Sequence, residues 1–441
     1  MRLIVTCAGV SATGAGDALK YNGELTMDFT YSEKTQQLRA QLRNFMDDHV
    51  VPRIRPWSEE VHAGVYPVSF MEDLKALARE EGLWNMFLPH LRDDEPGTRL
   101  SNLEYAPLAE IMGHIPWSAE VFNCNAPDTG NMEVLHMFGN EAQKEQWLKP
   151  LLNGEIRSAF AMTEPDVASS DATNIQTSIT RDGDDYVING RKWFITNAHH
   201  PNCKIFIVMG KTDFAADTYR QQSQVLVPMD TPGVQLVRNV TTINHHSPEG
   251  HSEVLFKDVR VPVGNLIASE GDGFMIAQAR LGPGRIHHCM RAIGMAEVCL
   301  ELMVARSQER KTFGKYLYKH GSISEWIARS RIEIEQARLL VLKTASMIDG
   351  VGAKGARKEI SMIKVVAPTL LTTVADRAMQ VFGAMGVSPD TPLADFYTGG
   401  RVLRFADGPD EVHLQTIARL ELKDSKDSLL DAANYLAVTE R

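Results

Sequence analysis

The chain has 441 residues, of which 44% are hydrophobic and 23% are charged, and its formal net charge is -10. This length is enough for two or three domains, and the acidic balance argues against a nucleic-acid partner, which needs a basic face. No run of about 18 uncharged apolar residues occurs, so we expect a soluble protein without a membrane span. Its 5 scattered cysteines lack a C-x-x-C pair, which fits a reducing compartment, and we expect a cytoplasmic location.

Residues 1–26 form the least interpretable part of the chain. Gly14 and Gly16 imitate the start of a dinucleotide-binding turn, but Leu19 stands where a third glycine is needed and no βαβ unit follows. The apolar stretch is too short for a secretory signal. We therefore interpret this segment as a non-native or disordered extension, with Met27 as the natural start of the chain.

Residues 27–155 have helical periodicity and predict an N-terminal helical bundle. An apolar stripe from Leu38 to Met46 indicates a first helix, which Pro52 is expected to end. A second helix begins near Met71 and is expected to stop at Gly82. Further helical patterns cover residues 103–112, 130–138 and 141–152.

Residues 156–270 are rich in strand patterns and predict a barrel-like sheet domain. Asp182-Gly183-Asp184 is expected to turn the chain, and Asn189-Gly190 to turn it again, because Asn-Gly favours tight hairpins. Strands are expected over residues 159–162, 175–179, 204–208, 224–227 and 254–262.

Residues 271–441 return to helical periodicity and predict a four-helix bundle. Long helices are expected near residues 274–308, 323–349 and 356–385, with a kink at Pro368. A last helix begins near Pro409. The predicted fold class is α+β, mostly α, with a helical bundle, a central β-domain and a second helical bundle.

Residues 158–197 are the stretch around which we expect the function to be organised. The ends of two predicted strands, Met162-Thr163 and Phe194-Ile195-Thr196, each carry a hydroxyl beside large apolar side chains. A flat heteroaromatic cofactor needs such an apolar wall and a few polar groups for its edge. From the spacing alone, an ordinary sheet whose aromatic residues form the core remains an alternative.

The motifs TEP, SSDATN and INGRKWFITNA, in this order within residues 163–198, resemble the flavin-binding β-domain of the acyl-CoA dehydrogenase family. The similarity extends from about residue 27 to the end, and is strongest to the subgroup of family members ten and eleven. It implies an FAD enzyme that converts an acyl-CoA thioester to the trans-2-enoyl-CoA. It also implies an electron-transfer flavoprotein, or a similar protein, as the acceptor.

The resemblance assigns the catalytic base to Asp407. The family has a Tyr-Glu-Gly-Thr segment whose carboxylate removes the α-proton, and this chain has Ala406-Asp407-Gly408-Pro409. Aspartate is shorter than glutamate by one methylene, or about 1.5 Å. The alternative is that the acids here only complement the dipole of the following helix.

The resemblance also assigns the binding residues. Arg285 and Gly408, together with Ser170, would contact the substrate. Arg285 has an ordinary helix-surface alternative. Residues assigned to the cofactor are Phe160, Met162, Thr163, Ser170, Phe194, Ile195, Thr196, Pro409 and Glu411.

Arg310, Phe313 and Gln380 match segments that, in the family, reach the FAD of a neighbouring subunit, so a homodimer or homotetramer is expected. The alternative for Arg310 is a solvated basic end of a helix. Three histidine pairs, including His287-His288, raise the question of a metal site. Adjacent residues point apart on a helix or strand, so they rarely bind one ion. No acid or cysteine follows at ligand spacing, and no metal is assigned.

Two alternative functions remain open from the sequence. An aspartate base also occurs in the nitroalkane oxidase branch of the superfamily, so an oxidase that uses Asp407 on a smaller, more acidic substrate is possible. The replacement of both the tyrosine and the glutamate of the family segment also allows a catalytically idle flavoprotein.

Overall fold

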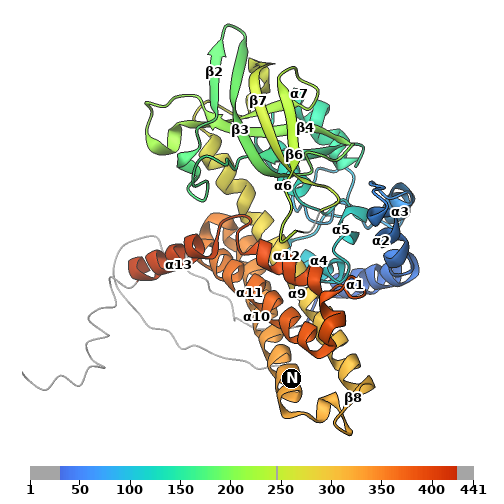
Figure 1. Cartoon of the computed structure of the whole chain (residues 1–441). Helices are drawn as coiled ribbons and strands as arrows, with labels where there is room; N and C mark the ends of the chain where they lie inside the picture. Colours follow the sequence, from blue (N-terminus) through green and yellow to red (C-terminus); the bar gives the residue numbers. More distant parts are fainter. Residues whose placement is uncertain (1–29, 245–246, 425–441) are drawn as a thin grey trace, which may run out of the picture.

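The computed structural model describes residues 30–244 and 247–424 of the chain. The sequence-based interpretation of residues 1–26 therefore lies outside the described residues. Figure 1 shows the sheet at one end of the molecule and the long C-terminal helices at the other, with the N-terminal helices beside their junction. No helix in the described residues is long and apolar enough to cross a membrane.

The N-terminal part is helical, as expected. Its main helices are α1 (Glu33–Phe45), α2 (Ile54–His62), α3 (Met71–Glu80), α4 (Asn102–Gly113), α5 (Ser118–Val121), α6 (Asp128–Phe138), α7 (Glu141–Gln143) and α8 (Lys149–Leu152). The expectation that Pro52 ends the first helix was wrong. A π turn, Met46–Val50, and a 3-10 turn, Val51–Arg53, connect α1 directly to α2. Pro52 lies near the start of the 3-10 turn, where its missing N–H is not needed.

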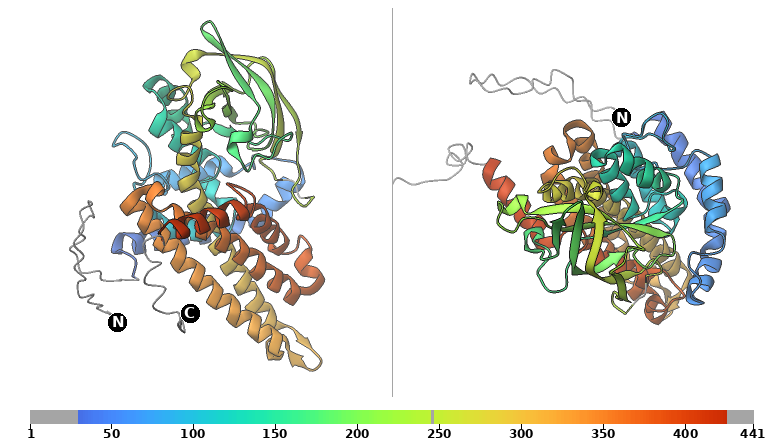
Figure 2. Two further views of the ribbon diagram at one scale, coloured as in Figure 1. Left: turned by 90° about the vertical axis from the view of Figure 1, so that its left-hand side faces the viewer. Right: turned by 90° about the horizontal axis from the view of Figure 1, so that it is seen from above.

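The central part is a seven-stranded sheet with the strand order β1-β4-β2-β3-β7-β6, in which β5 also pairs with β4. Its strands are β1 (Arg157–Ala161), β2 (Ser178–Asp182), β3 (Asp185–Thr196), β4 (Cys203–Lys211), β5 (Gln222–Pro228), β6 (Val234–Asn239) and β7 (His251–Pro262). Figure 2 shows that the sheet curls around its own core, which contains Phe206, Phe256 and Ile188.

The predicted turn at Gly183 is present, whereas the predicted turn at Asn189-Gly190 is absent. β3 continues through both residues and pairs with β2 and β7, with a register shift at this point. Asn189 Oδ1 instead accepts a hydrogen bond from Asp258 N on β7 at 2.8 Å. A side chain at position 190 would overlap Thr177. The Asn-Gly pair thus forms an irregularity in a long strand, because pairing on both sides outweighs the local turn preference.

The C-terminal part consists of long packed helices. They are α9 (Gly273–Glu309), α10 (Gly321–Gly355), α11 (Arg357–Phe382), α12 (Leu393–Leu403) and α13 (Asp410–Asp424), and a small hairpin, β8 (Lys311–Thr312) and β9 (Lys315–Tyr316), joins α9 to α10. α11 continues through Pro368. The pattern did not reveal α12. The predicted fold class is confirmed, and one apolar core joins the N-terminal and C-terminal helices, including Leu108, Ile293 and Leu371.

Candidate active site

The turn between α12 and α13 holds Asp407 in a fixed orientation. Asp407 has a left-handed backbone, with φ 57°, which is uncommon outside glycine but more frequent for aspartate. Its carbonyl oxygen accepts a hydrogen bond from Arg285 Nε at 2.9 Å and lies 3.3 Å from His413 Nε2. Contacts from α9 and α13 therefore fix the main chain from which the carboxylate projects.

The Asp407 carboxylate is largely enclosed, because its side chain is 19% exposed. Its Oδ2 lies 3.7 Å from His288 Nε2 on α9. Burial alone would raise the pKa of Asp407, but the electrostatic influence of His288 and of the cations Arg280, Lys364 and Arg285 outweighs it and holds this pKa below its ordinary value. The structure thus contains an ionised carboxylate that is mostly shielded from water, which is a chemically competent proton acceptor.

Lys364 on α11 stabilises the same turn through hydrogen bonds to its main chain. Its side chain is buried, and Nζ donates to the carbonyl oxygens of Leu403 at 2.5 Å and Ala406 at 2.8 Å. These carbonyls at the end of α12 lack helical partners. Lys364 satisfies both and places a positive charge close to Asp407.

Arg280 on α9 connects this turn to the sheet. Its guanidinium lies 4.1 Å from the centre of the Phe160 ring on β1, and its Nε donates to Asn131 Oδ1 at 3.1 Å. The same guanidinium contributes to the lowered pKa of Asp407. Arg280 therefore lies between the end of β1 and Asp407.

The two strand ends predicted to meet do so. Trp193 N donates to Thr163 O at 3.0 Å, and Lys192 Nζ donates to Met162 O at 2.8 Å. Phe194 follows with a left-handed backbone and a side chain that is 40% exposed. An exposed aromatic ring beside hydroxyl-bearing strand ends is a suitable set of groups for a flat heteroaromatic ring.

The neighbours of Phe194 differ in what they present to a ligand. The Thr196 hydroxyl lies 3.0 Å from His251 Nδ1 on the adjacent strand β7. The Ile195 side chain is 1% exposed and packs in the sheet core. A ligand at this strand end would therefore meet the main chain of Ile195 and not its side chain.

The remaining predicted residues fall into two groups. Gly408, Pro409 and Glu411 adjoin Asp407 at the start of α13, and Ser170 is exposed in the loop after β1. Arg310, Phe313 and Gln380 are exposed as well, and the Phe313 side chain is 95% exposed. Figures 1 and 2 show the β8–β9 hairpin, which contains Phe313, at the opposite end of the molecule from the sheet. Within one chain, the hairpin therefore lies far from the sheet.

Several polar residues near Asp407 were not assigned to the site from the sequence. Lys364 had a signal, because it occupies an apolar stripe four residues after Ile360. His288 was considered only as half of a histidine pair. Arg280 and His413 had no signal, because their roles depend on how distant helices pack.

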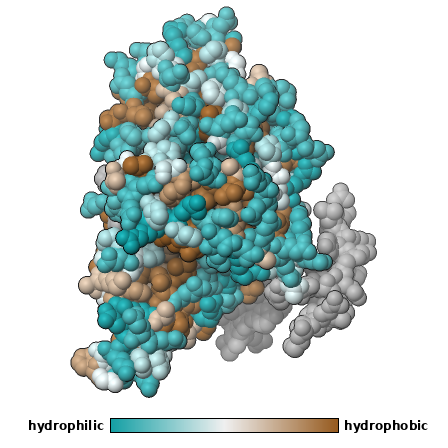
Figure 3. Space-filling view, turned by 90° about the vertical axis from the view of Figure 1, so that its right-hand side faces the viewer, coloured by the Kyte–Doolittle hydropathy of each residue, from teal (hydrophilic) through white to brown (hydrophobic). Residues whose placement is uncertain are grey.

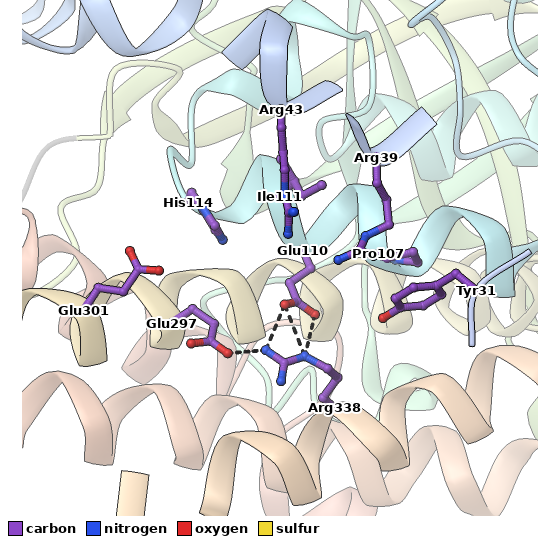
Figure 4. Close-up of a pocket in the computed structure, with 10 residues that line it drawn as sticks. All are labelled: Tyr31, Arg39, Arg43, Pro107, Glu110, Ile111, His114, Glu297, Glu301 and Arg338. Carbon is purple, nitrogen blue, oxygen red and sulfur yellow. Dashed lines mark hydrogen bonds and ion pairs between the residues drawn. The ribbon is translucent and has the colours of Figure 1, made fainter. Parts of the chain in front are cut away.

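A separate cavity of about 350 Å³ lies between α1, α4, α9 and α10 (Figure 4). Arg338 on α10 bridges Glu110 on α4, with a 3.0 Å contact from Nε to Oε2, and Glu297 on α9. Arginine and glutamate are equally represented in its lining, which comprises Tyr31, Arg39, Arg43, Pro107, Glu110, Ile111, His114, Glu297, Glu301 and Arg338. With its charges balanced, we interpret it as a polar helix junction outside the candidate site.

A sheet domain between two helical domains, with an enclosed carboxylate near its paired strand ends, is the architecture of flavin-dependent dehydrogenases. Three family descriptions match the chain: acyl-CoA dehydrogenase N-terminal domain at residues 32–155, middle domain at 159–259 and C-terminal domain at 271–422. The chain belongs to the acyl-CoA dehydrogenase family.

Similar proteins agree with this assignment. The chain is 54% identical over 419 residues to acyl-CoA dehydrogenase family member 11 of Gallus gallus, covering 92% of this chain and 52% of the relative. It thus spans about half the length of that relative. It is 53% identical over 416 residues to the probable acyl-CoA dehydrogenase FadE2 of Mycobacterium tuberculosis, covering 92% of this chain and 100% of the relative. The predicted similarity to family members ten and eleven is confirmed.

Solved structures show the same fold. A putative acyl-CoA dehydrogenase from Mycobacterium abscessus has a TM-score of 0.86 and 50% identity, covering 90% of this chain and 100% of the other. Butyryl-CoA dehydrogenase from Megasphaera elsdenii has a TM-score of 0.77 and 29% identity, with the same coverage.

Proposed function

We propose that the chain catalyses the FAD-dependent α,β-dehydrogenation of an acyl-CoA thioester to the trans-2-enoyl-CoA, with Asp407 as the base. The observation that carries this proposal is the largely enclosed Asp407 carboxylate, whose pKa is held below its ordinary value and whose main chain is fixed by contacts from α9 and α13. Membership of the family supports the substrate class.

In this mechanism Asp407 breaks the α C–H bond of the substrate and takes the proton on its carboxylate. Arg285 and His413 hold the main chain of Asp407 during the transfer, and Lys364 holds the preceding turn. Gly408 has φ 103° and a side chain there would approach His413 and Arg285. Glycine at this position therefore permits the positive φ and the close approach of His413.

The residues at the strand ends fit an FAD ring. Phe160, Met162 and Phe194 would supply the apolar wall, and Thr163 and Thr196 the hydroxyls for the polar edge. Ile195 would contribute its main chain. Ser170, Pro409 and Glu411 would lie around the cofactor and the CoA arm. FAD, when bound, supplies the acceptor for the β-hydrogen, which leaves as hydride with the electron pair.

We propose that the complete site requires at least two copies of the chain. Arg310, Phe313 and Gln380 are exposed, and the β8–β9 hairpin that contains Phe313 lies at the opposite end of the molecule from the sheet. An arginine fork suits a diphosphate, so these residues would hold the FAD of a partner in a homodimer or homotetramer. Figure 3 shows hydrophobic side chains gathered in the middle of one face, with further hydrophobic groups above and below them. An electron-transfer flavoprotein or a similar acceptor, and a cytoplasmic location, complete the proposal.

The test is anaerobic reduction of the flavin. Acyl-CoA thioesters of several chain lengths are expected to bleach the flavin absorbance of the wild type. Asp407→Asn is expected to retain FAD and lose bleaching, while Asp410→Asn, a buried carboxylate paired with Arg404, is expected to keep it. Bleaching by Asp407→Asn at the wild-type rate would remove Asp407 from the mechanism. FAD binding without bleaching by any substrate would instead indicate an idle flavoprotein.

One observation favours a second function, a nitroalkane-oxidase-like activity with the same base. Cations and His288 lower the pKa of Asp407, and a weaker base is better matched to a more acidic C–H bond. Bleaching by nitroalkanes but not by acyl-CoA, with release of hydrogen peroxide in air, would support this function over the first.

A further inference from the structure

Helix α9 carries three polar side chains at three-residue spacing: Arg285, His288 and Arg291. Residues three apart lie on one face of a helix. Arg285 holds the main chain of Asp407, His288 faces its carboxylate, and Arg291 contacts His288. Arg285 and His288 therefore both face Asp407, and Arg291 supports His288.

The contact between Arg291 and His288 determines which imidazole nitrogen carries the proton. Arg291 Nη2 lies 3.3 Å from His288 Nδ1, and a guanidinium can only donate. Nδ1 must therefore accept, which leaves the proton on Nε2. Nε2 is the atom that lies 3.7 Å from Asp407 Oδ2. Arg291 is itself held, because its Nη1 donates to Cys124 O at 3.2 Å.

His288 faces Asp407 as a neutral ring. Burial, assisted by the charge of Arg291, lowers the pKa of His288 to about 3. A neutral N–H favours the ionised carboxylate without giving it a proton. His288 also has no free lone pair with which to accept a proton from Asp407, so its geometry excludes a relay.

We propose that His288 is a positioning residue whose Nε2–H orients the Asp407 carboxylate towards the substrate, with its tautomer set by Arg291. This inference rests on the proposed role of Asp407 as the base. It gives one member of the His287-His288 pair a function. His287 points elsewhere, since its ring centre lies 5.1 Å from that of Tyr105 and 6.1 Å from that of Phe87.

Other titratable groups also act on Asp407 and must be kept constant in any test. They come from every element packed against the turn: Arg280, Arg285 and Cys289 on α9, Lys364 on α11, and His413 on α13. His288 faces the carboxylate with a neutral N–H group, and its Nε2 lies 3.7 Å from Asp407 Oδ2. Replacing it therefore changes one dipole and leaves the surrounding charges in place.

The test compares His288→Leu, which removes the donor, with His288→Gln, whose amide places an N–H near the position of Nε2. His287→Gln is the matched control on the same helix. FAD content and the thermal midpoint show that each variant is folded and loaded. Ionisation of Asp407 is followed by infrared titration of its carboxyl band, identified by subtracting Asp407→Asn, and flavin bleaching by acyl-CoA is followed against pH.

In His288→Leu we expect the Asp407 titration and the acid limb of the bleaching profile to move up by less than about one pH unit, because the 3.7 Å between Nε2 and Oδ2 is longer than a direct hydrogen bond. The plateau rate should fall by about 10- to 100-fold because the base is misplaced. His288→Gln should recover most of both, and His287→Gln should match the wild type.

An unchanged infrared titration in His288→Leu, or a His288→Gln variant as impaired as His288→Leu, would overturn the proposal. If His288→Leu does not fold, Arg291→Met provides the second test. It removes the donor to Nδ1 and lets the ring adopt the other tautomer, so the plateau rate is expected to fall towards that expected for His288→Leu; a wild-type rate would overturn the assigned role of Arg291. Failure of the proposed function is distinct: Asp407→Asn would still bleach the flavin, or the wild type would not bleach with any substrate.

Discussion

Lys192 is a buried cation that ties together the strand ends of the candidate cofactor site. Its side chain is 0% exposed, and Nζ donates to Glu164 Oε1 at 2.9 Å, Met162 O at 2.8 Å and Met209 O at 2.7 Å. Glu164 in turn accepts from the N–H groups of Gln176 and Thr177. One ion pair therefore joins β1, β3, β4 and the loop between β1 and β2.

Replacing Lys192 by Met leaves the shape nearly unchanged but removes the charge. Truncating one partner of a buried pair costs about 3–5 kcal/mol, because the other charge stays buried. Here the two main-chain donors still partly satisfy Glu164, so we expect about 3 kcal/mol, at the lower end of that range. In the double variant with Glu164→Gln, the loss should be smaller than the sum of the single losses by about 1–3 kcal/mol.

Urea unfolding at pH 7, followed by tryptophan fluorescence, measures this change as a shift in midpoint. Lys204→Met is the matched control. Lys204 is an exposed lysine on β4 whose Nζ donates to Pro201 O at 3.2 Å, and its loss should stay within about 0.5 kcal/mol. We also expect Lys192→Met to bind FAD more weakly, because Met162 and Thr163 lose their anchor. A Lys192→Met midpoint equal to that of Lys204→Met would refute the reasoning.

Two further predictions concern packing and pH. Gly294→Ala places a methyl group against Glu110 O where α9 crosses α4, and should destabilise the fold by about 3 kcal/mol; Gly350→Ala, a helical glycine with open space around it, should stabilise it by up to about 1 kcal/mol. Equal melting temperatures for the two variants would contradict this. Burial lowers the pKa of His200 in the folded chain to about 4 from an ordinary value of 6.5. On acidification the unfolded chain therefore takes up a proton at this residue before the folded chain does. The free energy of unfolding should fall as the pH drops from 6.5 to 4, by up to about 3 kcal/mol. His200→Asn keeps an acceptor for Asn202 N and should flatten this slope in urea titrations; an unchanged slope would show that other groups dominate it.

The architecture was predictable because long periodic segments determine it. The stripe from Leu38 to Met46 and the three long C-terminal helices appear where the pattern placed them. The errors occurred at strong local signals. Asn189-Gly190 has a strong local preference for a turn, yet β3 gains pairing with β2 on one side and β7 on the other by continuing. Pro52 did not end the helical region, because it lies near the start of a 3-10 turn that follows a π turn, where its missing N–H is not needed.

The candidate site was predictable only in part, and the division is physical. Asp407 and the two strand ends are recognisable because they lie in short segments whose residue types are themselves diagnostic. The surroundings of Asp407 come from residues far apart in the chain: Arg280 and His288 on α9, Lys364 on α11 and His413 on α13. No short-range pattern indicates which side chains of separate helices will meet. Only Lys364 contradicted its local pattern, as a charge within an apolar stripe.

The charge balance around Asp407 also constrains how the proposed reaction is promoted. Arg280, Arg285 and Lys364 place three positive charges near one carboxylate, and the neighbouring acid Asp410 is already paired with Arg404. These cations keep Asp407 ionised, but they also make it a weaker base, so basicity alone gives little advantage. In the proposed reaction the α-proton leaves a thioester beside Asp407, so negative charge would develop on the substrate near the same cations. Preorganised charges act most strongly where new charge appears in a site shielded from water, so the groups that weaken the base would also stabilise the product of the proton transfer.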